Sequence, residues 1–302
     1  MNVLVLGGRG FIGRHVVRAL KARGHKVIIG SRGNPCGDAG MRQVRMQHMT
    51  GVDTWTEVLH GIDAVVNTVG ILRERFGETY DMVHHRAPAT LAQVCAAQTI
   101  RLLHVSALGL SDDCRSRFLR SKLAGERAIT LAGGMATIVR PSLVDGEGGF
   151  GAKWVRQVAC WPVHVIPKDA VGKMAPIDAD DLGAAIAILC EQRDNDAPRE
   201  AELGGTAQLT MGEYLAAMRP PESHPVVSFS LPSWLARLAS HMCDALHFSP
   251  YSFGHLELMR KDNLPRHNLL PELLGRSPRA VGWYQRETSN PLHIEIEFTK
   301  LR

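Results

Sequence analysis

Short apolar runs alternate with helix-like segments along the first two-thirds of the chain. The runs are rich in β-branched residues, as buried strands are, and the intervening segments place apolar residues at helical spacing. The predicted helices are His15–Ala22, Pro88–Ala97 and Leu119–Leu131, and the predicted strands are Val3–Leu6, Val27–Gly30, Val44–Gln47, Ala64–Thr68, Arg101–Ser106 and Thr137–Arg140. Strands joined by crossover helices lie parallel, so the pattern predicts an α/β fold with a doubly wound parallel sheet.

The pattern changes after Pro141, where glycines gather between 146 and 151 and tryptophans and prolines follow. Residues 175–190 return to an apolar helix, Leu182–Leu189, which Asp180 or Asp181 can cap. We therefore expect a sheet core of residues 1–145, to which 175–208 return, and a small lobe of residues 146–174 and 209–302.

The segment from Leu231 predicts an amphipathic helix that begins after a Pro–Ser pair. We expect its apolar stripe to be buried within the small lobe. Docking of this stripe on a membrane protein or another partner is the alternative.

Composition and charge narrow the class of protein. The chain has 302 residues, is 45% hydrophobic and carries a formal charge of +5, with lysines and arginines interleaved with acids. This distribution is not that of a nucleic-acid-binding protein. The first strand starts too early for a signal peptide, and no apolar stretch is long enough to span a bilayer. The six cysteines are dispersed without a CxxC pair, which favours reduced thiols and a cytoplasmic location.

Three glycines stand between the first strand and the first helix. Gly7, Gly10 and Gly13 form a GxxGxxG pattern, in which the first permits a tight turn, the second lets the backbone approach a pyrophosphate and the third lets the helix pack on the sheet. The helix start, with Phe11 and Ile12, offers free N–H groups to the phosphates. The context predicts a dinucleotide-binding turn of the Rossmann type.

The end of the second strand bears on the choice of cofactor. Ser31 and Arg32 stand where NAD-selective sites carry an acid for the ribose 2′-hydroxyl. Together with Arg9 they can bind a 2′-phosphate, so NADP(H) is expected rather than NAD(H), although both arginines would also suit a solvated surface.

Several segments agree in order with a known family. They are Gly7-Gly-Arg-Gly-Phe-Ile-Gly13, Asp63-Ala-Val-Val-Asn-Thr-Val-Gly70, His104-Val-Ser-Ala-Leu-Gly109, Arg120-Ser-Lys-Leu-Ala-Gly-Glu126 and Arg140-Pro-Ser142. With them the chain resembles the extended and atypical short-chain dehydrogenases/reductases. It looks most like the NAD-dependent epimerase/dehydratase relatives grouped with the 39-kDa accessory subunit of respiratory complex I. The resemblance covers about residues 1–280; the tail after Trp283 matches nothing.

The resemblance implies roles for particular residues. Ser106 falls on the serine that orients a substrate carbonyl or hydroxyl, and Lys122 on the lysine of the family's YxxxK motif, which holds the nicotinamide ribose. The remaining cofactor-binding positions that it implies are Asn67, Val69, Gly70, Pro141 and Ser142.

The departure from the family is at the tyrosine, because Phe118 stands four residues before Lys122. A phenyl ring cannot transfer a proton, and general acid–base catalysis contributes about 10²–10⁴ in rate. Lys122 or Ser106 can serve as a substitute proton relay, or the substrate can supply its own acidity. The alternative is a catalytically silent NADP(H)-binding protein that stabilises or regulates a partner. Peripheral association with a membrane is compatible with the sequence.

Other residues have simpler explanations. His84 and His85 point about 100° apart on a helix and make a poor metal pair. Asp178, Asp180 and Asp181 suit a helix N-terminus better than paired catalytic carboxylates. The aromatic residues Phe150, Trp154, Trp161 and Trp234 can line an apolar cleft or fill the lobe's core, and residues 148–151 can form a lid hinge or a surface turn.

Overall fold

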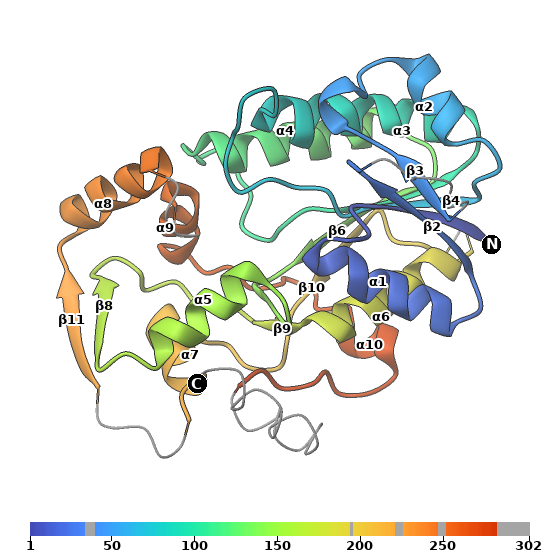
Figure 1. Ribbon diagram of the computed structural model, residues 1–302. Helices are drawn as coiled ribbons and strands as arrows, with labels where there is room; N and C mark the ends of the chain where they lie inside the picture. The colour runs from blue at the N-terminus through green and yellow to red at the C-terminus, as the bar shows by residue number, and fades with distance from the viewer. Residues whose placement is uncertain (34–39, 194–195, 221–225, 247–251, 283–302) are drawn as a thin grey trace, which may run out of the picture.

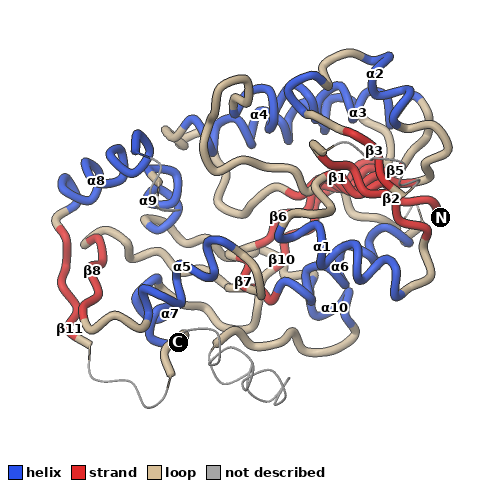
Figure 2. The backbone as a smooth tube through the Cα atoms, viewed as in Figure 1, coloured by secondary structure: helices blue, strands red, loops and turns tan. Residues whose placement is uncertain are grey.

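A parallel sheet of seven strands forms the centre of the computed structural model, which describes residues 1–33, 40–193, 196–220, 226–246 and 252–282. Its strand order is β10-β6-β5-β4-β1-β2-β3 (Figures 1 and 2). The strands are β1 (Asn2–Leu6), β2 (Lys26–Ser31), β3 (Met41–Gln43), β4 (Ala64–Asn67), β5 (Arg101–Val105), β6 (Ala136–Pro141) and β10 (Glu200–Leu203). The expected α/β fold with a doubly wound parallel sheet is confirmed. Cys36 and the tail after Trp283 lie outside the described residues.

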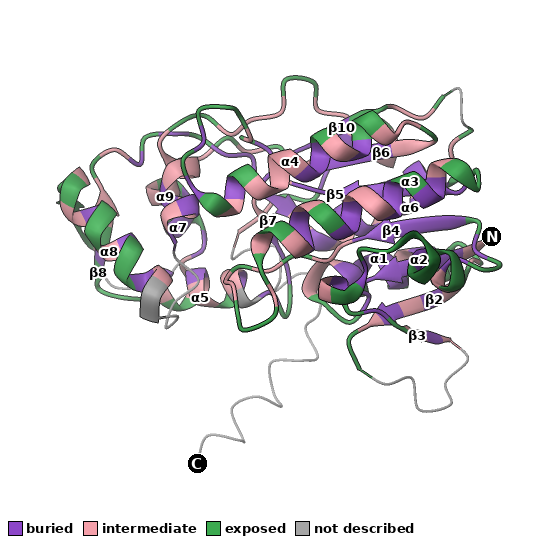
Figure 3. Ribbon diagram, turned by 90° about the horizontal axis from the view of Figure 1, so that it is seen from above, coloured by how far each residue is buried: buried purple, intermediate pink, exposed green. Residues whose placement is uncertain are grey.

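Helices cover both faces of the sheet because its central strands are apolar on both sides. In β1, Val3 and Val5 pack into one core with Leu182, whereas Leu4 and Leu6 pack into the other. The first face carries α1 (Phe11–Ala22), α6 (Ala179–Glu191) and α10 (Leu270–Leu274), and the second carries α2 (Val52–Val58), α3 (Ala87–Ala97), α4 (Arg117–Ala132) and a π-helix (Asp81–Arg86). Figure 3 shows the buried sheet between these layers.

A smaller group of elements lies beyond the edge of the sheet at which the strands end (Figure 1). It contains α5 (Phe150–Ala159), α7 (Met211–Ala217), α8 (Ser233–Leu246), α9 (Phe253–Met259) and the parallel pair of β8 (Val163–Pro167) and β11 (Val227–Leu231). A further short pair, β7 (Val144–Asp145) and β9 (Ile177–Asp178), adjoins α6. Val155, Tyr214 and Met218 fill a separate core here. No helix in the described stretches is long and apolar enough to cross a membrane.

Two local predictions are wrong. The third strand is Met41–Gln43 rather than Val44–Gln47, and Met46–His48 forms a 3₁₀ turn. Val44 and Met46 are nevertheless buried. The apolar pattern of this segment therefore predicted which residues are buried, but not that they lie outside the strand. The cap of α6 is Asp178, which accepts N–H groups from Asp180 and Asp181, because the helix begins at Ala179.

Candidate functional site

The glycine turn has the geometry of a phosphate cradle. Gly7 has φ +75°, a left-handed conformation that favours glycine, and the Gly10 N–H donates to the Gly7 carbonyl oxygen at 2.7 Å. A Cβ on Gly13 would lie 2.1 Å from that same oxygen, so this position accepts only glycine. Gly10 caps α1 without a side-chain hydrogen bond, and the first turn of α1 contains no acid. The N-terminus of α1 can therefore receive an anion.

The side chains at the start of α1 are held by protein. Ile12 packs into the core beneath the sheet, and the Phe11 ring lies against Gly149, where a Cβ would approach it to 2.8 Å. Arg14 donates to the carbonyl oxygen of Glu147 at 2.9 Å. These contacts seat the loop that contains Gly148, at φ +72°, on the N-terminal turn of α1, and they leave backbone N–H groups as the part of Phe11 and Ile12 that can bind phosphate.

A carboxylate that the sequence pattern did not indicate lies at the end of β2. Arg32 is exposed, and its Nη1 is 3.1 Å from both carboxylate oxygens of Glu78. Glu78 lies on a tight hairpin closed by reciprocal backbone hydrogen bonds with Arg75. Among the described residues, the buried Ser31 hydroxyl has no hydrogen-bond partner, and exposed Arg9 donates to the Met41 sulfur at 3.0 Å. Glu78 is 46 residues away from Arg32 in sequence, so no local spacing predicts this pair.

Asn67 fixes the loop that follows β4. Its side chain is fully buried, accepts the Val69 N–H at 3.1 Å and donates to His104 Nδ1 at 3.1 Å. Gly70, in the same loop, is exposed. Because the strands are parallel, the carboxyl ends of β1, β2, β4, β5 and β6 lie at one edge of the sheet, which brings this loop near the glycine turn.

The two expected catalytic residues both have uncommitted polar groups. The buried Ser106 hydroxyl, at the end of β5, has no hydrogen-bond partner among the described residues. Lys122 Nζ likewise has no hydrogen bond or ion pair within the described part of the chain and lies 5.7 Å from the centroid of the Phe118 ring. Burial lowers the pKa of Lys122 to about 8, against the raising effect of Glu126. Both groups can accept new partners.

Two buried histidines lie near Lys122 and stay neutral. The Ile71 N–H donates to His84 Nε2, so the ring proton is on Nδ1, which donates to the Ser121 hydroxyl. Burial, Lys122 and His104 hold the pKa of His84 well below its usual value. Burial and Lys122 lower the pKa of His104 to about 3. Among the described residues no cluster of potential ligands could hold a metal, so these rings serve as neutral hydrogen-bonding groups.

The Phe118 ring is enclosed by other rings. Its centroid is 5.7 Å from that of Tyr80 and 5.5 Å from that of His84, and it stacks on His255 of α9 at 6.2 Å. The Tyr80 hydroxyl donates to the carbonyl oxygen of Leu72, and burial raises the pKa of this phenol. Sequence reasoning missed Tyr80 and His255 because neither lies in a motif.

The turn after β6 is committed to structure. The Ser142 hydroxyl accepts the Ala175 N–H at 3.0 Å and donates to the carbonyl oxygen of Asn263 at 3.4 Å. Pro141 is the last residue of β6 and accepts the Leu108 N–H at 3.1 Å. These bonds tie the turn to the loop after β5 and to the C-terminal segment.

The sequence placed the aromatic residues of the lobe either in an apolar cleft or in the core of the lobe, and only some of them lie in one of these places. Trp154 packs against the core of the lobe, but Trp161 and Trp234 are exposed. The side chain of Phe150 lies outside what the structure describes.

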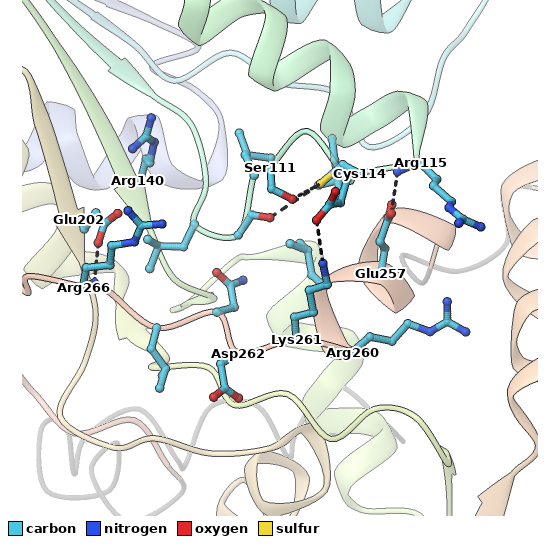
Figure 4. Close-up of a pocket in the computed structure, with 18 of the residues that line it drawn as sticks. Ser111, Cys114, Arg115, Arg140, Glu202, Glu257, Arg260, Lys261, Asp262 and Arg266 are labelled. Carbon is cyan, nitrogen blue, oxygen red and sulfur yellow. Dashed lines mark hydrogen bonds and ion pairs between the residues drawn. The ribbon is translucent and has the colours of Figure 1, made fainter.

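A polar cleft of about 900 Å³ lies beside the edge strand β10 (Figure 4). Glu200 and Glu202 face it, whereas Ala201 and Leu203 of the same strand pack into the core on the α6 face. Lys261 pairs with Asp113 across it at 3.3 Å. The charges are partly paired with one another, so the cleft is not an apolar substrate pocket.

Comparisons with known proteins identify the family. Residues 3–204 match the sequence pattern of the NAD dependent epimerase/dehydratase family. A ceramide reductase of Caulobacter vibrioides is 27% identical over 193 residues, which are 62% of this chain and 60% of the reductase. The mitochondrial NADH dehydrogenase (ubiquinone) 1 alpha subcomplex subunit 9 of Arabidopsis thaliana is 28% identical over 225 residues, 71% of this chain and 56% of the subunit. The matches thus span less than two-thirds of these relatives.

Solved structures share the fold at low sequence identity. A short-chain dehydrogenase/reductase superfamily protein of Agrobacterium tumefaciens with bound NAD superposes with a TM-score of 0.69 at 14% identity, covering 99% of this chain and 100% of the other. A UDP-glucuronic acid 4-epimerase of Bacillus cereus gives a TM-score of 0.63 at 17% identity, with 93% and 95% covered. The resemblance to atypical reductases and to the complex I subunit is confirmed. By the match of residues 3–204, the chain belongs to the NAD-dependent epimerase/dehydratase family.

Proposed function

We propose that this protein is an NADP(H)-dependent oxidoreductase or epimerase-like enzyme that acts on a small substrate. The observation that carries the proposal is the uncapped, acid-free N-terminus of α1 behind Gly7, Gly10 and Gly13. The residues present fit a dinucleotide, because Gly10 places no side chain before the first turn of α1, and because the buried hydroxyls of Ser31 and Ser106 have no hydrogen-bond partner in the described part of the chain.

Preference for NADP(H) is supported by the end of β2. No acid follows this strand directly, and Ser31, Arg32 and Arg9 can contact a 2′-phosphate. Glu78 opposes this preference, because Arg32 must exchange a carboxylate for the phosphate. A charge-assisted bond to phosphate, worth about 1.5–3 kcal/mol, exceeds an exposed ion pair, worth about 0–1 kcal/mol.

A bound dinucleotide would supply a hydride donor or acceptor through its nicotinamide ring. Asn67, Val69 and Gly70 would line the adenosine half of the dinucleotide, and Pro141 would border the nicotinamide half. Ser142 shapes the turn after β6 through its contacts with backbone groups. In our proposal Ser106 orients the substrate's carbonyl or hydroxyl. Lys122 binds the nicotinamide ribose and moves a proton in place of the absent tyrosine, since a pKa of about 8 gives both protonation states near neutral pH.

A second candidate function is a catalytically silent NADP(H)-binding protein with an assembly or regulatory role. The enclosure of Phe118 by Tyr80, His84 and His255 favours it, because that packing fills the space around the family's proton donor. The similarity to a subunit of NADH dehydrogenase suggests a protein partner.

We also propose the division into a nucleotide-binding core of residues 1–145 and 175–208 and a substrate or partner lobe of residues 146–174 and 209–302. Helix α10, within the second range, packs on α6 of the core. A cytoplasmic location is likewise proposed, on the dispersed cysteines, five of which are free in the described residues.

Mass spectrometry of purified protein for bound nucleotide, followed by NADPH oxidation assays with carbonyl and quinone panels, tests the proposal. We expect NADPH to bind and at least one panel compound to be reduced, and we expect Lys122→Met to lower that turnover. NADPH that binds but is never oxidised would favour the silent function.

Phe118→Tyr separates the two candidate functions further. Placing a phenol four residues before Lys122 raises turnover about tenfold if a working pocket remains, because general acid catalysis is restored. Phe76→Tyr, on an exposed ring of the hairpin, is the matched control and should change nothing. No gain from Phe118→Tyr, with NADPH affinity intact, would support the silent function.

A further inference from the structure

Exposed apolar side chains gather at one end of the molecule. Eight of the fourteen large hydrophobic residues that are exposed in the described part of the chain belong to β8, β11, α8 and the residues next to them. They form what we call the apolar end face: Trp161, Val163, Val165, Val227, Phe229, Trp234, Leu238 and Met242. A soluble monomer rarely exposes an apolar patch of this kind without a partner for it.

The strands β8 and β11 contribute a flat apolar surface. Val227 pairs with Val163 and Phe229 with Val165, so all four side chains project from the same face of the two-stranded sheet. His164, which alternates with them, is buried and approaches the carbonyl oxygen of Ala159 at the end of α5. The apolar face therefore looks away from α5.

Helix α8 contributes an apolar stripe. Trp234, Leu238 and Met242 follow one another at four-residue spacing and are all exposed, Trp234 to 69%. Ala236, Ser240 and Cys243, on the opposite side of α8, are buried. The expectation that this stripe fills the lobe's core is wrong, because the small residues of the helix face inward instead.

The two parts lie at the same end of the fold. β11 leads through Pro232 directly into α8, and Figure 1 shows both at the left end, while β1 to β4 lie at the right. Figure 3, from above, again places β8 and α8 together at the left extremity.

The charges beside this surface that have no partner of opposite sign in the described part of the chain are cations. Residues 158–169 and 227–246 contain the cations Lys168 and Arg237 and the acids Asp169 and Asp244. Asp169 pairs with Arg260, and Asp244 pairs with Arg73, at 3.2 Å, and also accepts the Phe253 N–H. Lys168 adjoins the last pair of the β8–β11 ladder. Exposed Arg237 borders the α8 stripe, and its guanidinium lies 5.7 Å from the centroid of the Phe253 ring, on the side of the polar cleft.

We propose that the apolar end face docks on the surface of an anionic lipid bilayer. Tryptophan, leucine and phenylalanine with adjacent cations are the composition of interfacial membrane-binding helices. A second copy of the chain is the less suitable occupant, because a two-fold interface would bring Lys168 and Arg237 of both copies together, with no unpaired acid between them among the described residues. The docking is independent of whether the enzyme turns over.

Flotation of the full chain with vesicles tests the proposal. We expect binding to phosphatidylcholine vesicles that contain phosphatidylglycerol, weaker binding to phosphatidylcholine alone, and a decline with added salt. The double variant Trp234→Ser, Leu238→Ser should bind at least about tenfold more weakly. Leu131→Ser, on an exposed leucine of α4, is the matched control and should bind as the wild type does.

Charge neutralisation gives a second readout. Lys168→Gln with Arg237→Gln should weaken binding to the anionic vesicles by about 25-fold, at about fivefold per charge, and bring it close to that of phosphatidylcholine. Absence of wild-type flotation, or flotation unaffected by the Trp234 and Leu238 changes, would overturn the proposal. A lipid-free dimer that these changes convert to a folded monomer would show that a second copy covers the face.

Discussion

Glu78 is the residue whose position most changes the interpretation of the cofactor site. Its carboxylate oxygens lie 3.1 Å from Nη1 of Arg32, the residue that we propose binds a 2′-phosphate. A carboxylate at this point competes with the phosphate for Arg32 and repels it. NADH, which lacks the phosphate, meets neither effect. The NADP(H) preference that we propose therefore depends on the balance between one cation and one acid.

Glu78→Gln should tighten NADPH binding about fivefold and leave NADH binding nearly unchanged, since an exposed ion pair is worth up to about 1 kcal/mol. Calorimetric titration at fixed salt measures both constants. Asp112→Asn, which alters another exposed pair, with Arg127, is the control. An equal change for NADPH and NADH would mean that Glu78 does not face the 2′ position.

Lys122 links the site to the pH dependence of stability. Its pKa is about 8 in the fold, below the ordinary 10.5, so between these values the unfolded chain binds more protons than the folded chain. Stability from this group therefore rises with pH across that window, by up to about 3 kcal/mol. The free energy of unfolding in urea is measured for wild type and for Lys122→Met at pH 7.5 and at pH 10. The difference between the two proteins should show this rise. A difference that does not vary with pH would contradict the burial of the ammonium.

At the scale of elements, α6 depends on its cap. Asp178 accepts the N–H groups of Asp180 and Asp181, while Asp180 and Asp181 add negative charge to the first turn. Asp178→Ala should lower the free energy of unfolding by about 0.5–2 kcal/mol. Urea denaturation measures the loss, and Asp112→Ala, at an exposed surface pair, should cost much less. Equal losses would show that the cap contributes no more than a surface acid.

The sequence predicted the elements whose pattern is local. The glycine turn and α1 follow from the spacing of Gly7, Gly10 and Gly13, because each requirement is set by backbone within a few residues. Glu78 and His255 could not be predicted, since their contacts with Arg32 and Phe118 cross long separations in the chain. The α8 helix was predicted but its orientation was not, because periodicity gives a stripe without saying which side packs inward.

At the scale of the whole molecule, the fold separates two surfaces. The candidate nucleotide site lies at the carboxyl ends of the strands, which face the small lobe near the middle of Figure 1, and the apolar end face lies on the outer side of that lobe, at the left end of the view. This arrangement would let the protein remain attached through α8 and β8–β11 while the glycine turn stays open to the solvent.

The central claim is that NADP(H) binds at the glycine turn with its 2′-phosphate on Arg32. Calorimetric titration of wild type and Arg32→Ala with NADPH and with NADH, at one salt concentration, tests it most directly. We predict that wild type binds NADPH more tightly than NADH, and that Arg32→Ala weakens NADPH about ten- to a hundredfold with little effect on NADH. Failure of the wild type to bind either nucleotide, or an equal loss for both in the variant, would contradict the account.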